Sequence, residues 1–414
     1  MKTTTIIGAG AAGLMAAATI LENSKGADYH IQIFEKNTSP GKKVIISGGG
    51  RCNVTTGIED KKILLSKYTR GADFIKKAFG KFSPRKCREW FESHGVPMKC
   101  ESDNRVFPIS DDGTEVVEAF THVFAKYRDK VTLHYGEGVS EVIKIDTRYQ
   151  ITTPKGAYES DIVVVTTGGN AYSHTGSTGD GYAFARSIGH SITQLGPSLS
   201  SFLTREKWTH ELSGLAFEKA RIENLEGPIL LTHFGLSGPL AFMYSSQIAW
   251  EAINKTNPKT IQLSPLADMG VAEWDSFLKL EFANHPKKLI TNILSEKLPR
   301  RFAELFVREY CPHIETTYPV SIARIDRAKI AELLGIGIPL TLTDRRPGDE
   351  FVTAGGVSTD EIDPETMESK IQKNLYFAGE VLNVDGYTGG FSLQICWASG
   401  YIVGRSIVEN IKSA

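Results

Sequence analysis

A chain of 414 residues, 41% hydrophobic and 23% charged, has the composition of a soluble globular protein with room for two or three domains. Lysine and arginine number 47 against 48 acidic residues, so the total charge gives no reason to expect nucleic acid as a partner. The five cysteines form no C-x-x-C pair and the ten histidines show no metal-ligand spacing, which argues against a disulfide framework and a metal site. We expect no membrane span, reduced thiols and a cytoplasmic location.

The N-terminal segment carries a glycine fingerprint between a strand and a helix. Residues 3–7 are all β-branched and predict a short buried strand, and an alanine-rich helix is expected directly after it. Between them, Gly8 permits a tight turn, Gly10 lets a pyrophosphate approach the backbone, and Gly13 lets the helix pack closely on the strand. The helix N-terminus, with Ala11 and Ala12, would face that anion.

A second predicted strand, residues 30–36, carries the acidic residue that this fingerprint requires. Glu35 lies 22 residues beyond Gly13, where a ribose-binding carboxylate belongs, and Lys36 follows it. The segment therefore predicts a dinucleotide site. The alternative is an ordinary glycine-rich turn with Glu35 as a surface charge.

The next stretch distinguishes FAD from NAD. A nicotinamide dehydrogenase usually continues into further strand and helix repeats, whereas this chain enters a loop with Lys42 and Lys43 and then "ISGGGRCNVTT". This order resembles the glutathione-reductase-like superfamily of flavoproteins, in which a glycine-rich segment runs beside the pyrophosphate and the flavin. The resemblance implies that FAD contacts Ser47, Gly49, Gly50, Arg51, Cys52 and Asn53 as well as both lysines.

Cys52 has no second cysteine nearby. Disulfide reductases of that superfamily carry a pair of cysteines four residues apart after the glycine run, but position 57 is Gly57. Dithiol chemistry is therefore not expected. Two interpretations of the single thiol stay open: a packed small residue, or a participant in substrate chemistry.

Two later segments are expected to return to the same nucleotide. Residues 161–169 predict a buried strand that ends in a turn containing Thr167 and Gly168, after a β-meander in residues 130–156. By resemblance, Val139 lies on a strand of that meander and its backbone contacts the adenine.

The last return combines a strand at residues 375–378, the turn Gly379-Glu380, the loop at Asp385, and Gly389-Gly390 opening a final helix. The resemblance implies that an acidic residue after the strand binds the ribityl chain, and that the helix N-terminus, with Phe391, Ser392 and Leu393, points at flavin N1 and the C2 oxygen. A helix N-terminus stabilises the negative charge of a reduced flavin.

We therefore predict an α/β fold: a discontinuous FAD-binding Rossmann domain with an inserted β-barrel-like domain that carries a helical sub-domain. The expected segments are residues 1–190 and 350–414 for the FAD domain, with a mostly helical excursion at 57–125, residues 191–265 and 319–349 for the β-rich domain, and residues 266–318 for the helical sub-domain. Turns are expected at Gly214, Gly227-Pro228 and Gly238-Pro239.

Residues 61–88 contain ten lysines or arginines and a single acidic residue, Asp73. Such a stretch is either a solvated helix face or a patch for an anionic substrate, the phosphate of NADPH, or RNA. It lacks the regularity of a nucleic-acid-binding motif.

Several strings along nearly the whole chain closely resemble the BaiN-like family of bacterial flavoproteins: "IIGAGAAGLMAA", "GKKVIISGGGRCNVT", "TTGGNAYSHTGSTGDGYAFARSIGH" and "LYFAGEVLNVDGYTGGFSLQICWASGY". The resemblance implies a non-covalent FAD and an oxidoreductase activity. Family members have been assigned different reactions, including reduction of a conjugated enone in bile acids and oxidation of aminoacetone. Thr56 departs from the asparagine often found at its position.

The expected mechanism is hydride transfer through flavin N5 to or from a small organic substrate, with NAD(P)H as a candidate donor that would bind transiently. The candidates for catalytic residues are Cys52 and His174. His174 is a candidate acid or base because an imidazole titrates near neutral pH. Asn53, Tyr172 and Tyr387 could also line the flavin. The alternatives are an amine oxidase that produces hydrogen peroxide and an RNA-modifying flavoprotein. The sequence does not specify an oligomeric state.

Overall fold

The computed structural model describes residues 1–412 and divides the chain into two units. The first unit comprises Met1–Ser198 and the chain from Glu350 onward, and the second comprises Leu199–Asp349. We expected the first boundary after residue 190, but the chain stays with the first unit up to Ser198. The reason is that β12 (Gly196–Ser198) pairs with β19 (Val352–Ala354).

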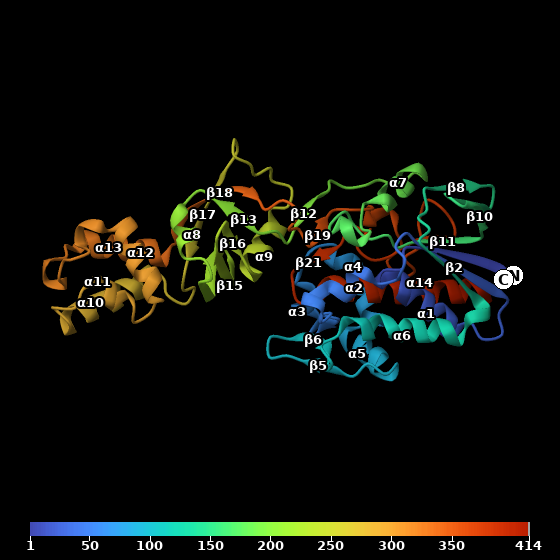
Figure 1. Ribbon diagram of the computed structural model, residues 1–414, viewed down its shortest axis with the longest axis horizontal. Coiled ribbons are helices and arrows are strands. Elements are labelled where there is room, and N and C mark those ends of the chain that lie inside the picture. The colour runs from blue at the N-terminus through green and yellow to red at the C-terminus, as the bar shows by residue number, and fades with distance from the viewer. Residues whose placement is uncertain (413–414) are drawn as a thin grey trace. The chain divides into compact units, whose positions relative to one another are not determined.

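The first unit is built on a parallel sheet with the strand order β20-β11-β1-β2-β7 (Figure 1). These strands span, in that order, Leu375–Phe377, Ile162–Val165, Lys2–Ile7, Tyr29–Glu35 and Val131–Tyr135. Parallel strands are covered on both faces, which is why the β-branched run at residues 3–7 forms one of them. The predicted Rossmann fold class is confirmed.

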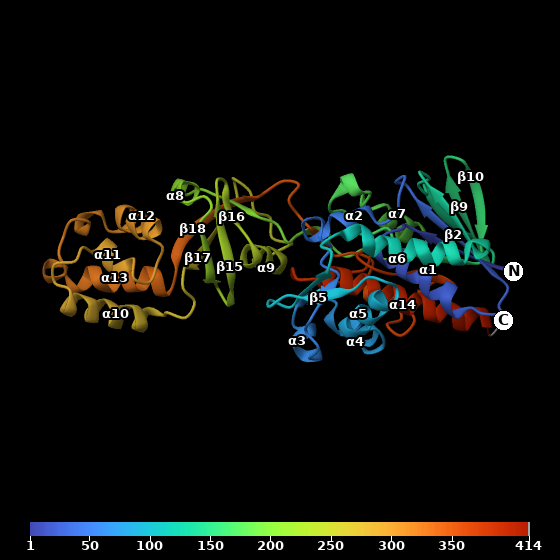
Figure 2. The same cartoon turned by 60° about the horizontal axis from the view of Figure 1, so that its bottom comes forward.

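Helices α1 (Ala11–Asn23) and α14 (Phe391–Lys412) lie side by side in both views (Figures 1 and 2). An ideal Cβ on Gly404 would lie 2.5 Å from the Thr19 Cβ, and one on Gly400 would clash with the Ala12 carbonyl oxygen. The two helices therefore run in the same direction with their backbones in close approach. None of the described helices is long and apolar enough to cross a membrane.

A small antiparallel sheet follows β7 and contains β8 (Glu141–Ile145), β9 (Arg148–Thr153) and β10 (Gly156–Ser160). The expectation that Val139 lies on a strand is wrong. Val139 lies in the loop between β7 and β8, because Gly136 and Gly138 interrupt the extended pattern and pairing resumes at Glu141.

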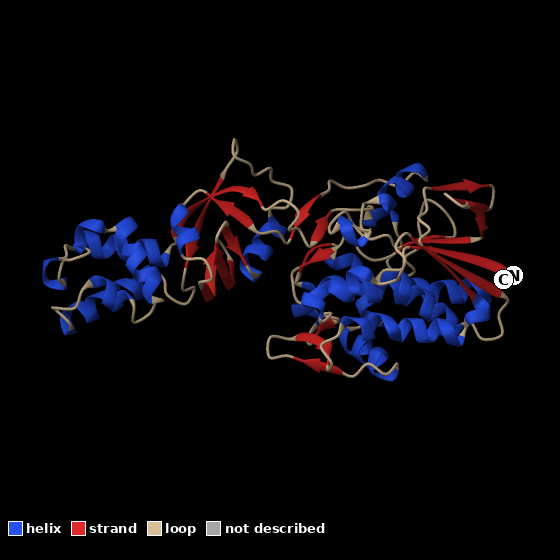
Figure 3. Ribbon diagram, in the orientation of Figure 1, coloured by secondary structure: helices blue, strands red, loops and turns tan. Residues whose placement is uncertain are grey.

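The excursion after the glycine run is mostly helical, with short strands between the helices (Figure 3). Its helices are α3 (Lys61–Leu65), α4 (Ala72–Lys81), α5 (Pro84–Ser93) and α6 (Gly113–Lys126). Its strands are β3 (Thr55–Thr56), β4 (Tyr68–Arg70), β5 (Met98–Cys100) and β6 (Arg105–Pro108). Strands β5 and β6 form a hairpin that also pairs with β3.

The second unit contains a closed barrel with the order β13-β16-β15-β14-β17-β18. Its strands span Phe202–Thr204, Gly235–Ser237, Leu225–Thr232, Ala216–Ile222, Lys259–Ser264 and Ile338–Arg345. The turn expected at Gly227-Pro228 is wrong, because both residues lie inside β15. The turn at Gly238-Pro239 instead opens α9 (Pro239–Gln247), since proline is well tolerated at the first position of a helix.

Four helices extend from this barrel: α10 (Val271–Asn284), α11 (Ile290–Leu294), α12 (Arg300–Tyr310) and α13 (Arg324–Gly335). The helical sub-domain expected at residues 266–318 contains the first three, and α12 begins directly after Pro299. Helix α13 packs against α10, so the helical part continues beyond residue 318.

The close contact between α1 and α14 can be tested by substitution. We expect Gly404→Val to lower the free energy of unfolding of the first unit by about 2 kcal/mol, because the new side chain would overlap Thr19. Gly80→Ala in α4 is the matched control, since an added Cβ there meets no atom within 4 Å. This substitution should raise the free energy of unfolding by about 1 kcal/mol, because alanine favours a helix more than glycine does. Urea denaturation followed by circular dichroism measures both. Equal stability of Gly404→Val and the native chain would contradict the contact.

Candidate functional site

The carboxyl ends of β1, β2, β11 and β20 meet at one edge of the parallel sheet. The chain proceeds from β1 to β2 on one side and later places β11 on the other side of β1. Such a reversal of strand order is the position at which open α/β sheets bind ligands. Each glycine-rich or acidic segment of the FAD prediction follows one of these strands or borders this edge.

The glycines at the end of β1 set the distance between strand and helix. Gly8 has φ of 103°, and an ideal Cβ on it would lie 2.7 Å from the Thr166 carbonyl oxygen at the end of β11. A Cβ on Gly13 would clash with the Gly8 carbonyl oxygen. Both residues therefore have the roles expected from the fingerprint: a tight turn, and close packing of α1 on β1.

Gly10 differs from its neighbours, because an ideal Cβ on it meets no atom within 4 Å. Its backbone, with φ of −81° and ψ of −173°, is one that any residue adopts. It is the N-cap of α1, no side chain caps that helix, and no acidic residue lies in its first turn, which begins with Ala11 and Ala12. The open space and the unopposed helix N-terminus fit a bound phosphate.

Glu35 lies at the end of β2 beside this turn. Its Oε2 accepts a hydrogen bond from the Ala9 backbone N–H at 2.9 Å, and its Oε1 accepts from the backbone and side chain of Asn37. The carboxylate is thus held next to the first turn of α1, as a ribose ligand would be. Lys36 turns to the side and pairs with Asp180 at 2.6 Å. The loop that contains Val139 passes close to Lys36, because a Cβ on Gly138 would lie 3.1 Å from the Lys36 Cβ.

The glycine run after α2 (Lys42–Ile46) has a left-handed backbone. Gly48, Gly49 and Gly50 have φ values of 58°, 73° and 91°, and Cys52 follows at 57°. An ideal Cβ on Gly49 or Gly50 meets no atom within 4 Å, so one side of the run is open. A cofactor can approach the bare backbone there.

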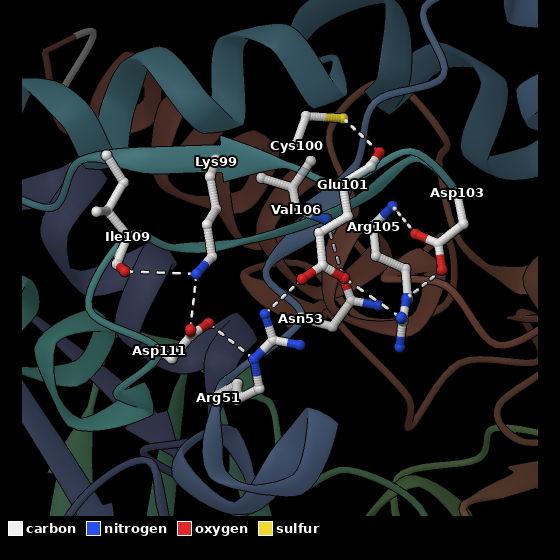
Figure 4. Close-up of polar contacts among 10 residues, drawn as sticks. All are labelled: Arg51, Asn53, Lys99, Cys100, Glu101, Asp103, Arg105, Val106, Ile109 and Asp111. Carbon is white, nitrogen blue, oxygen red and sulfur yellow. Dashed lines mark hydrogen bonds and ion pairs between the residues drawn. The ribbon is translucent and has the colours of Figure 1, made fainter.

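The side chains around this run are bonded within the protein. Ser47 Oγ donates to the Val44 carbonyl oxygen at 2.7 Å, and Asn53 Oδ1 accepts from the Val106 N–H at 3.2 Å. Arg51 pairs with acidic residues of the neighbouring hairpin, as Figure 4 shows. Contacts of this segment with the cofactor would therefore come mainly from the backbone.

The thiol of Cys52 is fully buried, and burial raises its pKa to about 12. It packs against the start of α6, where an ideal Cβ on Gly113 would lie 3.1 Å from the Cys52 Cβ. A protonated, inaccessible thiol is a poor nucleophile. The geometry favours the packed interpretation of Cys52 over participation in chemistry.

Lys43 and Glu380 form an ion pair of 2.9 Å between α2 and the turn after β20. The Lys43 ammonium also lies 5.9 Å from the centre of the Tyr172 ring. Gly379, with φ of 80°, lets this turn approach α1, since a Cβ on it would lie 2.9 Å from the Ala12 Cβ. Glu380 is thus close to the N-terminus of α1 and paired with a cation.

His174 lies in a short exposed turn near Tyr172, with ring centres 5.3 Å apart. Lys42 donates to the His174 carbonyl oxygen at 3.0 Å, which ties this turn to the start of α2. Tyr172 has a left-handed backbone and stacks on Phe351. Unlike Cys52, the His174 side chain is accessible for proton transfer.

Thr167 and Gly168 follow β11. The side chain of Thr167 points to α7 (Asp180–Ser187), because a Cβ on Gly181 would clash with its hydroxyl oxygen. Any contact of this turn with the cofactor would therefore involve its backbone, where Gly168 has φ of 74°.

Asp385, in β21 (Asp385–Gly386), is almost fully buried and forms a bidentate ion pair with Arg70 of β4. It also accepts a hydrogen bond from Ser198 Oγ at 3.1 Å. The sequence analysis missed Arg70 because it lies within the basic stretch and 315 positions before its partner. The available signal was an arginine in a β-branched and aromatic segment, "YTR", where a solvated charge is uncommon.

Helix α14 begins at Phe391, directly after Gly389 and Gly390, which have φ values of 128° and 88°. A Cβ on Gly390 would clash with the Thr55 carbonyl oxygen, so the start of α14 lies against β3, which follows the glycine run in the sequence. Inside the helix, Gln394 accepts from Thr55 Oγ1 at 2.6 Å, which holds the two segments together. Ser392 and Leu393 are half-buried in the first turn.

The N-termini of α1 and α14 are separated along one direction. Because Gly400 lies level with Ala12, the second residue of α1, α14 extends beyond the start of α1 by about eight residues, or about 12 Å at 1.5 Å per residue. An extended ribityl chain can connect an anion at α1 with a ring at α14.

The predicted site residues that these contacts bring to one edge of the sheet are Gly8, Gly10, Ala11, Ala12, Gly13, Glu35, Lys42, Lys43, Ser47, Gly49, Gly50, Arg51, Cys52, Asn53, Thr167, Gly168, Gly379, Glu380, Asp385, Gly389, Gly390, Phe391, Ser392 and Leu393. Their individual contacts with FAD stay a prediction. No group of histidine, cysteine, aspartate and glutamate residues in the described chain could hold a metal ion.

Five of the ten cations in the basic stretch form ion pairs within the described chain. Arg70 is buried in its ion pair, Lys77 and Lys81 share Glu365, Arg85 pairs with Glu89, and Arg88 pairs with Glu59. The exposed cations without an ion-pair partner among the described residues include Lys61, Lys62 and Lys76.

The fold and the site define a flavoprotein of the Rossmann type. An uncapped helix N-terminus faces open space at Gly10, a carboxylate is fixed at the end of β2, a bare glycine backbone is open on one side, and a second helix begins against β3. These features fit the phosphates, the ribose and the ring of FAD.

The chain belongs to the family described as HI0933-like protein Rossmann domain, whose model matches residues 2–406. It is similar to a 3-dehydro-bile acid delta(4,6)-reductase of Clostridium scindens, with 28% identity over 421 residues and 98% of each chain covered. It is equally similar to the ribosomal RNA dihydrouridine synthase of Haemophilus influenzae, with 28% identity over 419 residues and 97% of each chain covered. The same activity is named for a relative from Escherichia coli, 28% identical over 422 residues and 97% of each chain.

Solved structures show the same fold at low identity. An open conformation of a flavocytochrome c3 fumarate reductase has a TM-score of 0.52 and 16% identity, over 99% of this chain and 79% of that chain. FrdA of the E. coli quinol fumarate reductase gives 0.52 and 15%, over 100% of this chain and 71% of that chain. The protein is an FAD-dependent oxidoreductase of the BaiN-like kind.

Gly10 allows a test of cofactor binding that leaves folding intact. We expect Gly10→Ala to fold as the native chain, because its backbone angles suit alanine and the added Cβ is free of contacts. Its dissociation constant for FAD should rise about tenfold or more, since the methyl group occupies the phosphate space. Gly13→Ala is the contrasting variant, and it should lose stability even without FAD. Equilibrium dialysis and thermal denaturation separate the two effects, and native FAD affinity in Gly10→Ala would contradict the site.

The burial of Cys52 predicts its reactivity. At pH 8 a thiol with a pKa of about 12 is almost entirely protonated, so Cys52 should not react with a disulfide reagent in the folded protein. Cys100 is exposed and should react first. In Cys100→Ser we expect no fast-reacting thiol until denaturant is added. Rapid labelling of Cys52 in that variant, located by mass spectrometry, would restore its candidacy as a catalytic thiol.

Proposed function

We propose that this protein reduces a carbon–carbon double bond conjugated with a carbonyl group, using reduced FAD. The observation that carries the proposal is the chemistry shared by its full-length relatives. A 3-dehydro-bile acid with Δ4,6 unsaturation is a conjugated ketone, and dihydrouridine arises when the C5–C6 bond of uracil, conjugated with the C4 carbonyl, is reduced. In both compounds the carbonyl group makes a carbon of the conjugated double bond able to accept a hydride.

Reduced FAD, when bound, supplies a hydride from N5. The chain's own contribution is charge and position. The N-terminus of α14 lies against β3, and the N–H groups of its first turn can stabilise negative charge. Segment 47–53 presents backbone rather than side chains, which allows a planar group to lie close.

His174 is the residue that we propose as proton donor to the substrate. Reduction of a conjugated carbonyl compound needs a proton on the carbon next to the carbonyl after the hydride has been added. His174 is exposed, lies beside Tyr172, and its turn is bonded to α2, whereas Cys52 is buried. Removal of this group should slow the reduction of substrate and leave the reduction of the flavin unchanged.

We further propose that NAD(P)H reduces the flavin in a transient complex. The sequence contains a single dinucleotide fingerprint, at Gly8–Gly13, and FAD occupies it in this assignment. A nicotinamide donor would therefore bind only while it transfers its hydride. The substrate class that we propose first is a small conjugated ketone.

Uridine in RNA is the second candidate substrate, favoured by the similarity to two ribosomal RNA dihydrouridine synthases. The exposed Lys61, Lys62 and Lys76 could contact phosphates, although half of the cations in the basic stretch are paired. Two results would support this substrate: binding of the protein to RNA weakens steeply as the salt concentration rises, and this salt dependence is smaller in a variant in which the three lysines are neutral.

Anaerobic stopped-flow spectroscopy tests the proposed function. The flavin is first reduced with NADH or NADPH and then mixed with a conjugated enone, with the corresponding saturated ketone as the matched control. We expect reoxidation by the enone to exceed that by the saturated ketone by about 100-fold or more, because the saturated compound offers no carbon that accepts a hydride at the same cost. A flavin that reacts only with oxygen, after reduction by an amine, would identify an oxidase instead.

His174→Gln extends this experiment. It should lower the rate of enone reduction by about 100-fold, the usual contribution of a general acid, with an unchanged rate of flavin reduction by the nicotinamide. Tyr387→Phe, four positions before the start of α14, is the comparison variant. Native enone reduction by His174→Gln would show that the proton comes from elsewhere.

A further inference from the structure

Arg51 is the centre of a polar cluster outside the chemistry described above (Figure 4). Its Nη2 lies 2.6 Å from Glu101 Oε1, and its Nε lies 2.7 Å from Asp111 Oδ1. The guanidinium also lies over the Phe107 ring, 3.9 Å from the ring centre. The two ion pairs and the ring contact of the guanidinium are thus all with the β5–β6 hairpin and the residues that follow it.

The backbone around Arg51 is bound to the same hairpin. Val54 N–H donates to the Val106 carbonyl oxygen at 2.8 Å, and Val106 N–H donates to Asn53 Oδ1 at 3.2 Å. The start of α6 also contacts the run, because an ideal Cβ on Gly113 would lie 3.0 Å from the Gly50 carbonyl oxygen. The glycine run therefore rests on residues 98–113, and its other side is open.

The glycine run needs such support. Gly48, Gly49 and Gly50 have left-handed backbones and no side chains to pack, so they carry a large conformational entropy when free. Cys52 also has a positive φ, which costs a residue with a Cβ about 1 kcal/mol. Within the run the backbone N–H groups of Arg51 and Cys52 both donate to the Ser47 carbonyl oxygen, the latter at 2.9 Å, and these bonds close the loop.

The cluster is electrically balanced. Its charged members are three cations and three anions: Arg51, Lys99, Arg105, Glu101, Asp103 and Asp111. It offers no net positive charge to a phosphate or to a reduced flavin. A cluster of ion pairs without net charge can hold segments of the chain in a fixed arrangement, but it does not attract an anion.

We propose that Arg51 is a positioning residue that fastens the glycine run to the β5–β6 hairpin and so shapes the surface on which FAD lies. It does so by bridging Glu101 and Asp111, and it does not bind the cofactor directly. The inference rests on FAD binding and is independent of the substrate proposed above. It revises the sequence-based expectation that the Arg51 side chain contacts FAD.

The decisive variant removes the partners and keeps the arginine. In Glu101→Gln/Asp111→Asn the guanidinium retains its charge but loses both carboxylates. We expect the FAD dissociation constant to rise about tenfold, as it should in Arg51→Gln, because both changes release the glycine run. If Arg51 were a direct ligand, the freed cation would hold FAD as tightly as before or more tightly, and only Arg51→Gln would lose affinity.

Three further variants complete the experiment. Arg105→Gln is the matched control, since Arg105 pairs with Glu101 at 3.2 Å and Asp103 at 2.6 Å but lies on the hairpin itself. It should leave FAD affinity unchanged. Arg51→Lys should recover only part of the affinity, because a lysine cannot bridge two carboxylates as a planar guanidinium does. The single variant Asp111→Asn should give an intermediate loss, which keeps the inference testable if the double variant fails to fold.

The readouts are FAD affinity by fluorescence quenching, circular dichroism of the protein without FAD, and the flavin reduction potential at saturating FAD. We expect native circular dichroism and an unchanged potential in Arg51→Gln, because the lost group does not touch the ring. A more negative potential in that variant, full rescue by lysine, or native affinity in the double variant would each overturn the inference. Failure of the native chain to bind FAD would instead refute the cofactor assignment on which it rests.

Discussion

The close approach of α1 to β1 is the constraint on which the remainder of the site depends. It is possible only because Gly13 leaves room for the Gly8 carbonyl oxygen, and it aims the N-terminus of α1 at the space in front of Gly10. Helix α14 packs on α1 through Gly400 and Gly404, so the position of α1 determines where the N-terminus of α14 lies. The dipole of a helix acts on a ligand only near the terminal turns of that helix, so the N-termini of α1 and α14 must both lie close to the cofactor. Small residues at helix crossings supply that placement.

The charges of the site follow one pattern: nearly every side-chain cation is paired within the described chain. Lys43 is bonded to Glu380, Lys36 to Asp180, and Arg70 to the buried Asp385. The positive potential available to an anionic cofactor therefore comes mainly from backbone N–H groups at helix ends. Such groups need no reorganisation when negative charge develops on a reduced flavin, whereas a mobile lysine would have to be ordered first. The paired side chains hold the segments that carry these N–H groups.

The sequence was sufficient for the elements whose signals are local. The strand at residues 3–7, the glycine turn after it and the helix spacing of residues 271–310 each depend on neighbouring residues, and the structure has all of them. Long-range ion pairs have no such signal: Arg70 and Asp385 are 315 positions apart, and the partners of Arg51 lie on a hairpin some 50 positions later. The loop position of Val139 and the helix after Gly238 were missed because a short glycine-containing stretch is compatible with a strand, a turn or a helix start.

Relatives with the same length and equal identity to this chain carry names that refer to a bile acid and to ribosomal RNA. Substrates so different in size can share one site design only if the features that hold the cofactor are separate from those that choose the substrate. We infer that in this chain the former are mainly backbone, namely glycines and helix ends, together with the side-chain carboxylate of Glu35. A conjugated carbonyl compound asks little more of such a site than a flat approach to the ring and a nearby proton. Selectivity must then come from side chains that the cofactor does not need, and these are free to differ among relatives without loss of the flavin.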